Sequence, residues 1–170
     1  MPIYMWLILS CIVLQRIIEL RIARSNEKWM KEHGGVEKGR DHYKWFLIVH
    51  TLFFVFLIAE ALWRNNQPFQ FSYSLFVLFI ITQCIRIWCI TTLGKFWNTK
   101  IIISPQFSIV NEGPYKFVKH PNYIIVGVEL FVIPLLFHAY FTAMLFPLLH
   151  IFLLFVRIPI EEKALKETKI

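Results

Sequence analysis

Residues Trp45–Trp63 read WFLIVHTLFFVFLIAEALW, and this apolar stretch decides the fold class. A helix needs about 20 predominantly apolar residues to cross a bilayer, and this stretch is long enough. A tryptophan stands at each end, as expected of side chains that anchor a span at the two membrane interfaces. The stretch therefore predicts a transmembrane helix.

Four further apolar stretches run from Ile3 to about Leu20, Phe71 to Ile90, Ile124 to Phe137 and Tyr140 to Val156. Little more than His138 and Ala139 separates the last two, so we expect them to form a tight helical hairpin. The stretch before that turn is short and contains Pro134, so it must borrow residues from the preceding segment or be kinked and buried by protein. The pattern predicts an all-α polytopic membrane protein of about five transmembrane helices, in a single domain of residues 1–170.

The composition excludes an ordinary soluble domain, because 57% of the residues are hydrophobic and these are concentrated in long runs. The net charge of +7 could suit a nucleic-acid-binding protein. However, the Lys and Arg residues flank apolar runs, where they contact anionic lipid headgroups, so we expect membrane lipids and no nucleic acid as partners. The three cysteines all lie in apolar runs without metal-ligand spacing, and we expect no metal site.

Lys and Arg also predict the orientation. The segment Arg16–Lys44 holds eight, the segment Thr91–Tyr123 holds four, and the tail from Arg157 holds four. The connections Asn65–Gln70 and His138–Ala139 hold none. The positive-inside rule therefore places the N-terminus outside the cell membrane, and the C-terminus in the cytoplasm.

Ionisable side chains inside the predicted spans are costly and require an explanation. Arg16, Glu19 and Glu60 lie near span ends, which favours pairing that locks helices together, or snorkelling to the interface. For Arg86 and Glu129, a structural pairing and a functional role are equally supported.

The densest polar motif is GPYKFVKHPNY, residues 113–123, which leads directly into a predicted span. Gly-Pro favours a rigid turn, and Pro121 suits the first position of a helix. The first turn of that helix would present free N–H groups to an anionic ligand, with His120 and two tyrosines nearby. The motif predicts either a ligand-binding turn or a purely structural helix cap.

A second polar motif, RIPIEEKAL, occupies residues 157–165 after the last apolar stretch. Arg157 and Glu161 are four residues apart and would be neighbours on a helix, where a simple ion pair would contribute little. The predicted hairpin brings this motif beside the His-Pro turn. Two polar clusters from distant sequence therefore converge on one site.

The order of Arg86, Thr92-Leu93-Gly94, Trp97, GPYKFVKHPNY, a hydrophobic hairpin and R-x-x-x-E-E-x-x-L resembles the isoprenylcysteine carboxyl methyltransferase family. The similarity is strong over the C-terminal half, about residues 86–170, where the cofactor and catalytic elements should lie. The HPNY turn alone also occurs in sterol-reductase-like membrane enzymes. Lys119 stands where the family usually has arginine, and Ile125 where it has glycine.

The resemblance implies S-adenosylmethionine as the cofactor and assigns roles to individual residues. Arg157 would face the methyl acceptor and, with Glu161, form the catalytic pair, and Arg86 is a second acceptor-binding candidate. The cofactor-binding set would be Phe107, Ser108, Ile109, Val110, Tyr115, His120, Pro121, Asn122, Tyr123 and Glu161.

The function implied is methylation of a carboxylate or hydroxyl oxygen on a lipophilic acceptor, such as a prenylated cysteine or a small molecule with a long alkyl chain. A carboxylate acceptor would need no general base, whereas a hydroxyl acceptor would use Glu161 or His120. The alternatives are an NADPH-dependent membrane reductase of the sterol-reductase type and a non-enzymatic membrane component.

Overall fold

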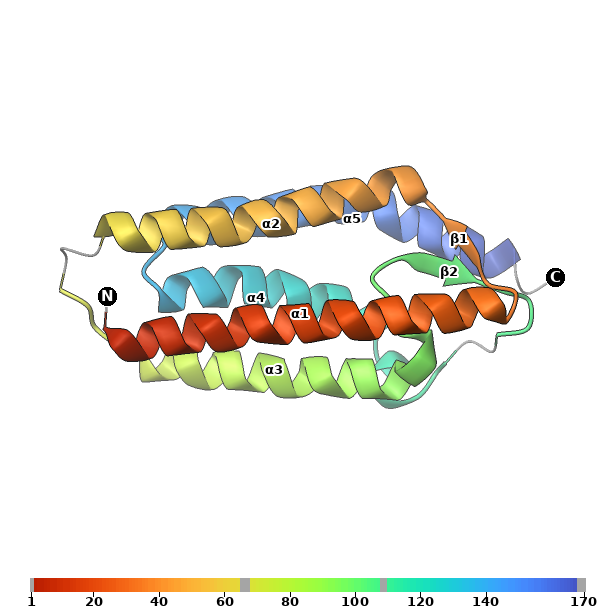
Figure 1. The fold of residues 1–170 in the computed structure, drawn as a ribbon, viewed down its shortest axis with the longest axis horizontal. Helices are drawn as coiled ribbons and strands as arrows, with labels where there is room; N and C mark the ends of the chain where they lie inside the picture. The colour runs from red at the N-terminus through yellow and green to blue at the C-terminus, as the bar shows by residue number, and fades with distance from the viewer. Residues whose placement is uncertain (1, 65–67, 108–109, 168–170) are drawn as a thin grey trace.

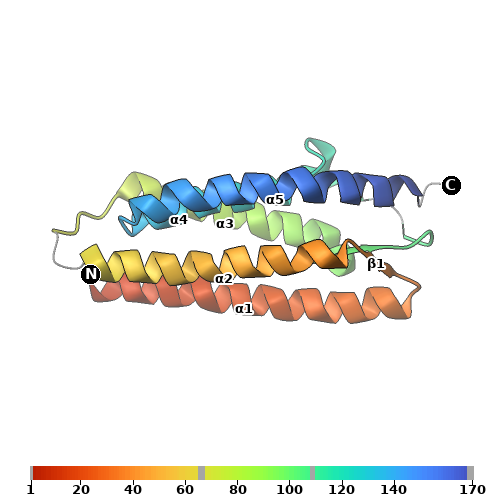
Figure 2. The same ribbon diagram turned by 90° about the horizontal axis from the view of Figure 1, so that it is seen from above.

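The computed structural model describes residues 2–64, 68–107 and 110–167 and consists mainly of an elongated bundle of helices (Figure 1). The long elements are α1 (Ile3–Glu32), α2 (Arg40–Trp63), α3 (Tyr73–Leu93), α4 (Pro121–Leu136) and α5 (Tyr140–Glu167). Seen from above, α1 and α2 lie on one side of the bundle, and α4 and α5 on the other (Figure 2). The start of α1 and the end of α5 lie at opposite ends of the bundle (Figure 1).

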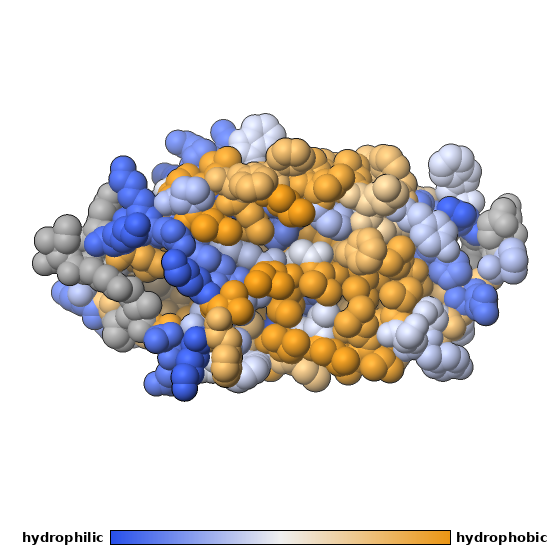
Figure 3. All heavy atoms as spheres, turned by 180° about the vertical axis from the view of Figure 1, so that it is seen from behind, coloured by the Kyte–Doolittle hydropathy of each residue, from blue (hydrophilic) through white to orange (hydrophobic). Residues whose placement is uncertain are grey.

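The helices have the apolar surface of a membrane protein. Within the described residues, α1, α2, α3 and α5 are long and apolar enough to cross a bilayer, and α4 is shorter. Apolar side chains cover the middle of the face shown in Figure 3, and hydrophilic side chains gather at its two ends. Large apolar side chains such as Leu47, Ile81 and Phe152 are exposed, as expected where the surrounding solvent is lipid. The prediction of an all-α polytopic membrane protein is confirmed.

The predicted hairpin is present as α4 and α5, joined by residues 137–139. His138 has a positive φ of 59°, which turns the chain sharply after α4. At 1.5 Å per residue α4 is about 24 Å long, shorter than a bilayer core. Half of its residues are buried against neighbouring helices, and its N-terminus lies well inside the length of the bundle (Figure 1). The short apolar stretch is thus buried by protein, as expected.

A small two-stranded sheet is present that the apolar pattern did not predict. Strand β1 (Val36–Lys38) pairs antiparallel with β2 (Ile101–Ile103), with Glu37 opposite Ile102. The buried Ile101 and Ile103 pack against Ala164 of α5. The sheet therefore ties two connections of the chain to the last turns of α5. This end of the bundle, where α1 and α5 finish, is called the basic end below.

The ionisable residues inside the bundle pair with one another. Arg86 of α3 donates two hydrogen bonds to Glu19 of α1, at 2.8 and 2.7 Å, and one to Glu129 of α4 at 2.9 Å. Arg16 contacts both carboxylates at 2.8 Å, and Gln83 donates to Glu129 at 2.8 Å. We call Arg16, Glu19, Gln83, Arg86 and Glu129 the charge network. Two guanidinium and two carboxylate groups balance in charge, so the network joins α1, α3 and α4 without a net buried charge.

Candidate active site

Tyr123, in the first turn of α4, is the centre of the polar cluster at the basic end. The helix begins at Pro121, as predicted, because His120 before it has a non-helical backbone and proline fits the first helical position. The Tyr123 hydroxyl donates a hydrogen bond to Glu161 Oε2 at 2.5 Å and accepts one from Arg157 Nε at 2.7 Å. The two motifs predicted to converge do meet, and Tyr123 is where they meet.

Arg157 is a buried guanidinium, 7% exposed, fixed from three directions. Besides its bond to Tyr123, it donates through Nη2 to the backbone carbonyl of Thr99 at 2.6 Å. Its Cζ atom lies 4.8 Å from the centre of the Phe46 ring, a cation–π contact with α2. No described residue forms a hydrogen bond with its Nη1. The guanidinium is therefore oriented rigidly and retains N–H groups for a ligand oxygen.

Glu161 lies beside the His-Pro turn. Its Oε2 atom is 3.9 Å from His120 Nδ1, and the His120 ring stacks on Tyr123 with centroids 5.4 Å apart. The direct ion pair with Arg157 that the i, i+4 spacing suggested is absent from the described contacts. Both residues bind the Tyr123 hydroxyl instead, because that hydroxyl can accept from the guanidinium while donating to the carboxylate.

Three buried polar atoms at this turn have no hydrogen-bond partner among the described residues: Tyr115 Oη, His120 Nε2 and Asn122 Oδ1. All three belong to residues expected to bind the cofactor. Burial raises the pKa of Tyr115, so its hydroxyl keeps its proton near neutral pH. Buried polar atoms without partners cost free energy, so a polar ligand that supplied those partners would be stabilised here. The residues present therefore fit a polar cofactor.

The 3₁₀ turn η3 (Gly113–Lys116) holds Tyr115 against α3, and a glycine makes this packing feasible. Gly113 has φ of 52°, and a Cβ atom there would come within 2.6 Å of Thr92 Oγ1. Any larger residue would clash and would also be strained in this left-handed conformation. The absence of a side chain at Gly113 thus allows the Gly-Pro turn to pack closely against α3.

Several predicted site residues lie elsewhere. Phe107 stacks on Trp29 and packs against Phe96, in an aromatic cluster beside the end of α1. Val110 is a half-buried loop residue, and positions 108 and 109, the predicted Ser108 and Ile109, lie outside the described residues. Arg86 belongs to the charge network, with every partner there on α1 or α4. The polar cluster thus contains Tyr123, His120, Arg157 and Glu161, without Phe107 or Arg86.

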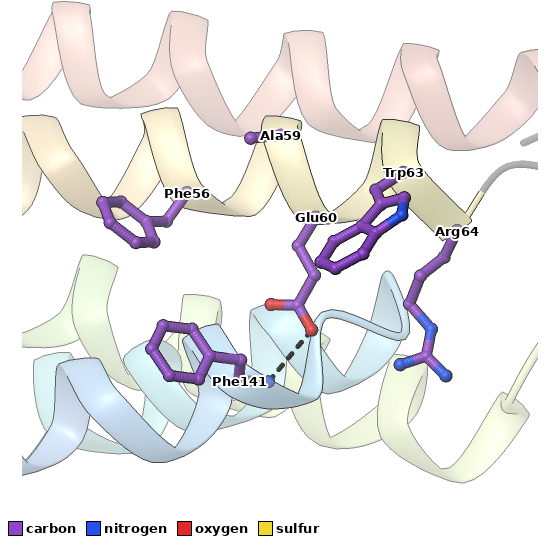
Figure 4. Close-up of a pocket in the computed structure, with 6 residues that line it drawn as sticks. All are labelled: Phe56, Ala59, Glu60, Trp63, Arg64 and Phe141. Carbon is purple, nitrogen blue, oxygen red and sulfur yellow. Dashed lines mark hydrogen bonds between the residues drawn. The ribbon is translucent and has the colours of Figure 1, made fainter.

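A cavity of about 620 Å³ opens at the other end of the bundle and is shown in Figure 4. Its walls are Phe56, Ala59, Glu60, Trp63, Arg64 and Phe141. Glu60 accepts hydrogen bonds from the N–H groups of Phe141 at 3.0 Å and Thr142 at 2.9 Å, and thereby caps the start of α5. Glu60 was expected to pair with another residue, and its partners are the backbone N–H groups at the start of α5. This cavity is separate from the polar cluster at the basic end.

Two groups that hold Arg157 in place, the Thr99 carbonyl and the Phe46 ring, were not predicted from the sequence. Thr99 contributes a backbone carbonyl, to which residue type gives no clue, and its hydroxyl lies 3.2 Å from that of Tyr43. Phe46 is one of many aromatic residues in an apolar stretch. Only its position near the basic end of α2 pointed to this contact. A ring can pack on the Arg157 guanidinium only if the two residues lie at the same depth in the membrane.

More than half of the chain matches a known protein family. The isoprenylcysteine carboxyl methyltransferase (ICMT) family matches residues 75–167. The chain is 43% identical over 162 residues to "Uncharacterized protein YpbQ" of Bacillus subtilis, covering 95% of this chain and 96% of that relative. It is 29% identical over 160 residues to an uncharacterised protein of Haemophilus influenzae, covering 92% and 91%. No solved structure matches the chain. The chain belongs to the isoprenylcysteine carboxyl methyltransferase family, and it is a membrane methyltransferase of that type.

Proposed function

We propose that the protein transfers a methyl group from S-adenosylmethionine to a carboxylate or hydroxyl oxygen of a lipophilic acceptor. The observation that carries the proposal is the buried Arg157, which is fixed through Nε and Nη2 and keeps Nη1 available. A buried guanidinium with unused N–H groups suits an oxygen anion, because charge-assisted bonds are strong in a low-dielectric site. The acceptor's apolar tail would lie between helices on the membrane side of Arg157.

The cofactor would be held by Tyr115, His120, Asn122 and Glu161. Three of these residues carry the buried polar atoms without partners, and Glu161 offers a carboxylate to a cationic or hydroxylated ligand. S-adenosylmethionine, when bound, supplies an electrophilic methyl group. The residues of the protein then contribute orientation and exclusion of water.

The need for a base depends on the acceptor. A carboxylate is ionised at neutral pH, and Arg157 would only have to orient it. A hydroxyl must lose its proton during transfer, and Glu161 or His120 Nε2 would take it. His120 Nε2 is buried and has no hydrogen-bond partner among the described residues, and Glu162 Oε1 lies 3.7 Å from it, so the nitrogen is near a carboxylate and still free to take the proton.

We also propose that the basic end faces the cytoplasm of the cell. Most Lys and Arg residues lie in the connections and helix ends at this end, and the positive-inside rule assigns such segments to the cytoplasmic side. The polar cluster would then open to the water-soluble cofactor, while the acceptor would enter from the membrane.

The test is incubation of the purified protein in detergent with methyl-labelled S-adenosylmethionine and a lipid extract. We expect label in a lipophilic product and thermal stabilisation of the protein by S-adenosylhomocysteine, because a ligand that binds only the folded state raises apparent stability. Stabilisation by NADPH, without stabilisation by S-adenosylhomocysteine and without label transfer, would instead support a reductase. Exposed Arg24→Ala, on α1, is the matched control and should behave as wild type.

A further inference from the structure

His150 carries a buried polar atom that the proposed function does not use. The residue lies on α5, two helical turns before Arg157, and is 2% exposed. Its Nε2 atom is 3.1 Å from the backbone carbonyl oxygen of Tyr123. Its Nδ1 atom is buried and has no hydrogen-bond partner among the described residues.

The carbonyl partner fixes where the imidazole proton lies. A carbonyl oxygen can only accept, so Nε2 of His150 must carry the hydrogen and donate it to Tyr123. A second proton on Nδ1 would place a charge among apolar helices, and neither the hydrogen bond nor the ring contacts of His150 involve a carboxylate. Nδ1 therefore presents a lone pair, which is a hydrogen-bond acceptor that lacks a donor.

Arg157 and His150 contact the same two residues, Phe46 and Tyr123. The Phe46 ring lies 4.8 Å from Arg157 Cζ and contacts the His150 ring edge to face, with centroids 6.3 Å apart. Tyr123 holds both residues, Arg157 through its hydroxyl and His150 through its backbone carbonyl. His150 thus lies nearer the middle of α5 than Arg157, at the depth where the proposed function places the tail of an acceptor.

We propose that His150 is a specificity residue that accepts a hydrogen bond from an O–H or N–H group of the acceptor. The inference rests on the proposed function, because the acceptor oxygen must be bound to Arg157 for its neighbouring atoms to reach His150. A hydrocarbon tail cannot satisfy Nδ1, and neither can a carboxylate, since both lack a donor. The preferred acceptor therefore carries a hydrogen-bond donor in addition to the oxygen that is methylated.

Two substitutions separate this role from a purely structural one. In His150→Gln the side-chain amide can reach the Nε2 position and donate to the Tyr123 carbonyl, but nothing replaces Nδ1. In His150→Asn the amide oxygen lies near the Nδ1 position and can accept, but the side chain is too short to reach that carbonyl. A structural role predicts that Asn is the harmful change, whereas acceptor recognition predicts that Gln is.

The probes are palmitic acid and hydroxypalmitic acids whose hydroxyl moves from beside the carboxylate to the middle of the chain. Binding to the full-length protein is measured by calorimetry, with S-adenosylhomocysteine-induced thermal stabilisation as the check that each variant is folded. In wild type we expect one isomer to bind about fivefold tighter than palmitic acid, as one net hydrogen bond allows. His150→Gln should lose this preference while binding palmitic acid normally, and His150→Asn should retain it.

The inference is overturned if no isomer binds wild type better than palmitic acid, or if none binds at all. It is also overturned if the preference survives in His150→Gln. Methyl transfer to the same compounds is measured separately. Label incorporated without a hydroxyl preference would leave the proposed function standing and remove the role of His150. A hydroxyl preference in binding without any incorporated label would refute the proposed methyl transfer and leave the binding role of His150 standing.

Discussion

The Nε atom of Arg157 donates a hydrogen bond to the Tyr123 hydroxyl over 2.7 Å, so the first turn of α4 orients the guanidinium at the end of α5. The same hydroxyl donates its own proton to Glu161. One tyrosine therefore connects the residue proposed to bind the acceptor with the residue proposed to bind the cofactor. Because the hydroxyl serves both at once, its removal should affect both.

Tyr123→Phe removes this hydroxyl but keeps the ring, which lies 5.6 Å from Arg157 Cζ. We expect kcat/KM for the acceptor to fall about 10- to 100-fold, because a hydrogen bond to a charged group contributes about 1.5–3 kcal/mol. Steady-state kinetics with labelled S-adenosylmethionine would measure this. Tyr73→Phe, at the opposite end of the bundle, is the control and should be silent. Unchanged kinetics in Tyr123→Phe would mean that the guanidinium needs no such support.

Arg157→Ala should abolish or strongly weaken acceptor turnover while leaving affinity for S-adenosylhomocysteine nearly intact. Arg157→Lys should not restore activity fully, because an ammonium group cannot reach the Tyr123 hydroxyl and the Thr99 carbonyl while also presenting a free fork to the acceptor. Calorimetry and turnover assays on the same preparations separate the two effects. Full activity in Arg157→Lys would show that positive charge alone suffices.

Glu161→Gln should weaken cofactor binding. The carboxylate accepts from Tyr123 and lies beside His120, so its charge is available to a cationic ligand and its oxygens to hydroxyl or amine donors. The amide keeps the shape and removes the charge, and we expect about a 10-fold loss of S-adenosylmethionine affinity, as for a charge-assisted hydrogen bond. Calorimetric titration is the measurement, with Glu32→Gln on the exposed end of α1 as control. Equal affinities would remove Glu161 from the cofactor site.

The sequence predicted the helices and the convergence of the two motifs, because apolar length and a short hairpin turn constrain both strongly. It could not predict that Tyr123 would separate Arg157 from Glu161, since the i, i+4 spacing fits a direct pair equally well. The contact of Arg157 with the Thr99 carbonyl could not be predicted either, because every residue type has a backbone carbonyl. The strands β1 and β2 are three residues each, too short to produce an alternating pattern.

Topology can be tested independently of chemistry. A reporter fused after Ile170 should report a cytoplasmic location, and one inserted at Asn66 an external location. The reason is the four Lys and Arg residues from Arg157 onward, against none in Asn65–Gln70 and His138–Ala139. Protease protection in inverted vesicles would provide a second measurement. An external C-terminus would separate the polar cluster from the cytoplasmic cofactor and refute the proposed mechanism.

The charge network leads to a prediction about stability and about the role of Arg86. Arg86→Leu would leave Glu19 and Glu129 facing one remaining guanidinium, that of Arg16, and so leave one buried negative charge uncompensated. Breaking a buried pair in this way costs about 3–5 kcal/mol, so we expect a marked loss of thermal stability in detergent. The exposed Arg21→Ala is the control and should change little.

The double variant Arg86→Leu with Glu19→Leu separates unpaired charge from lost function. It removes one charge of each sign and keeps the Arg16–Glu129 contact at 2.8 Å, so most of the lost stability should return, because an apolar pair often replaces a buried ion pair without cost. If Arg86 serves only the network, the double variant should also recover acceptor turnover. If Arg86 binds the acceptor, stability should return while KM for the acceptor stays high. Thermal unfolding and kinetics on the two single variants and the double variant form the cycle that decides between these roles.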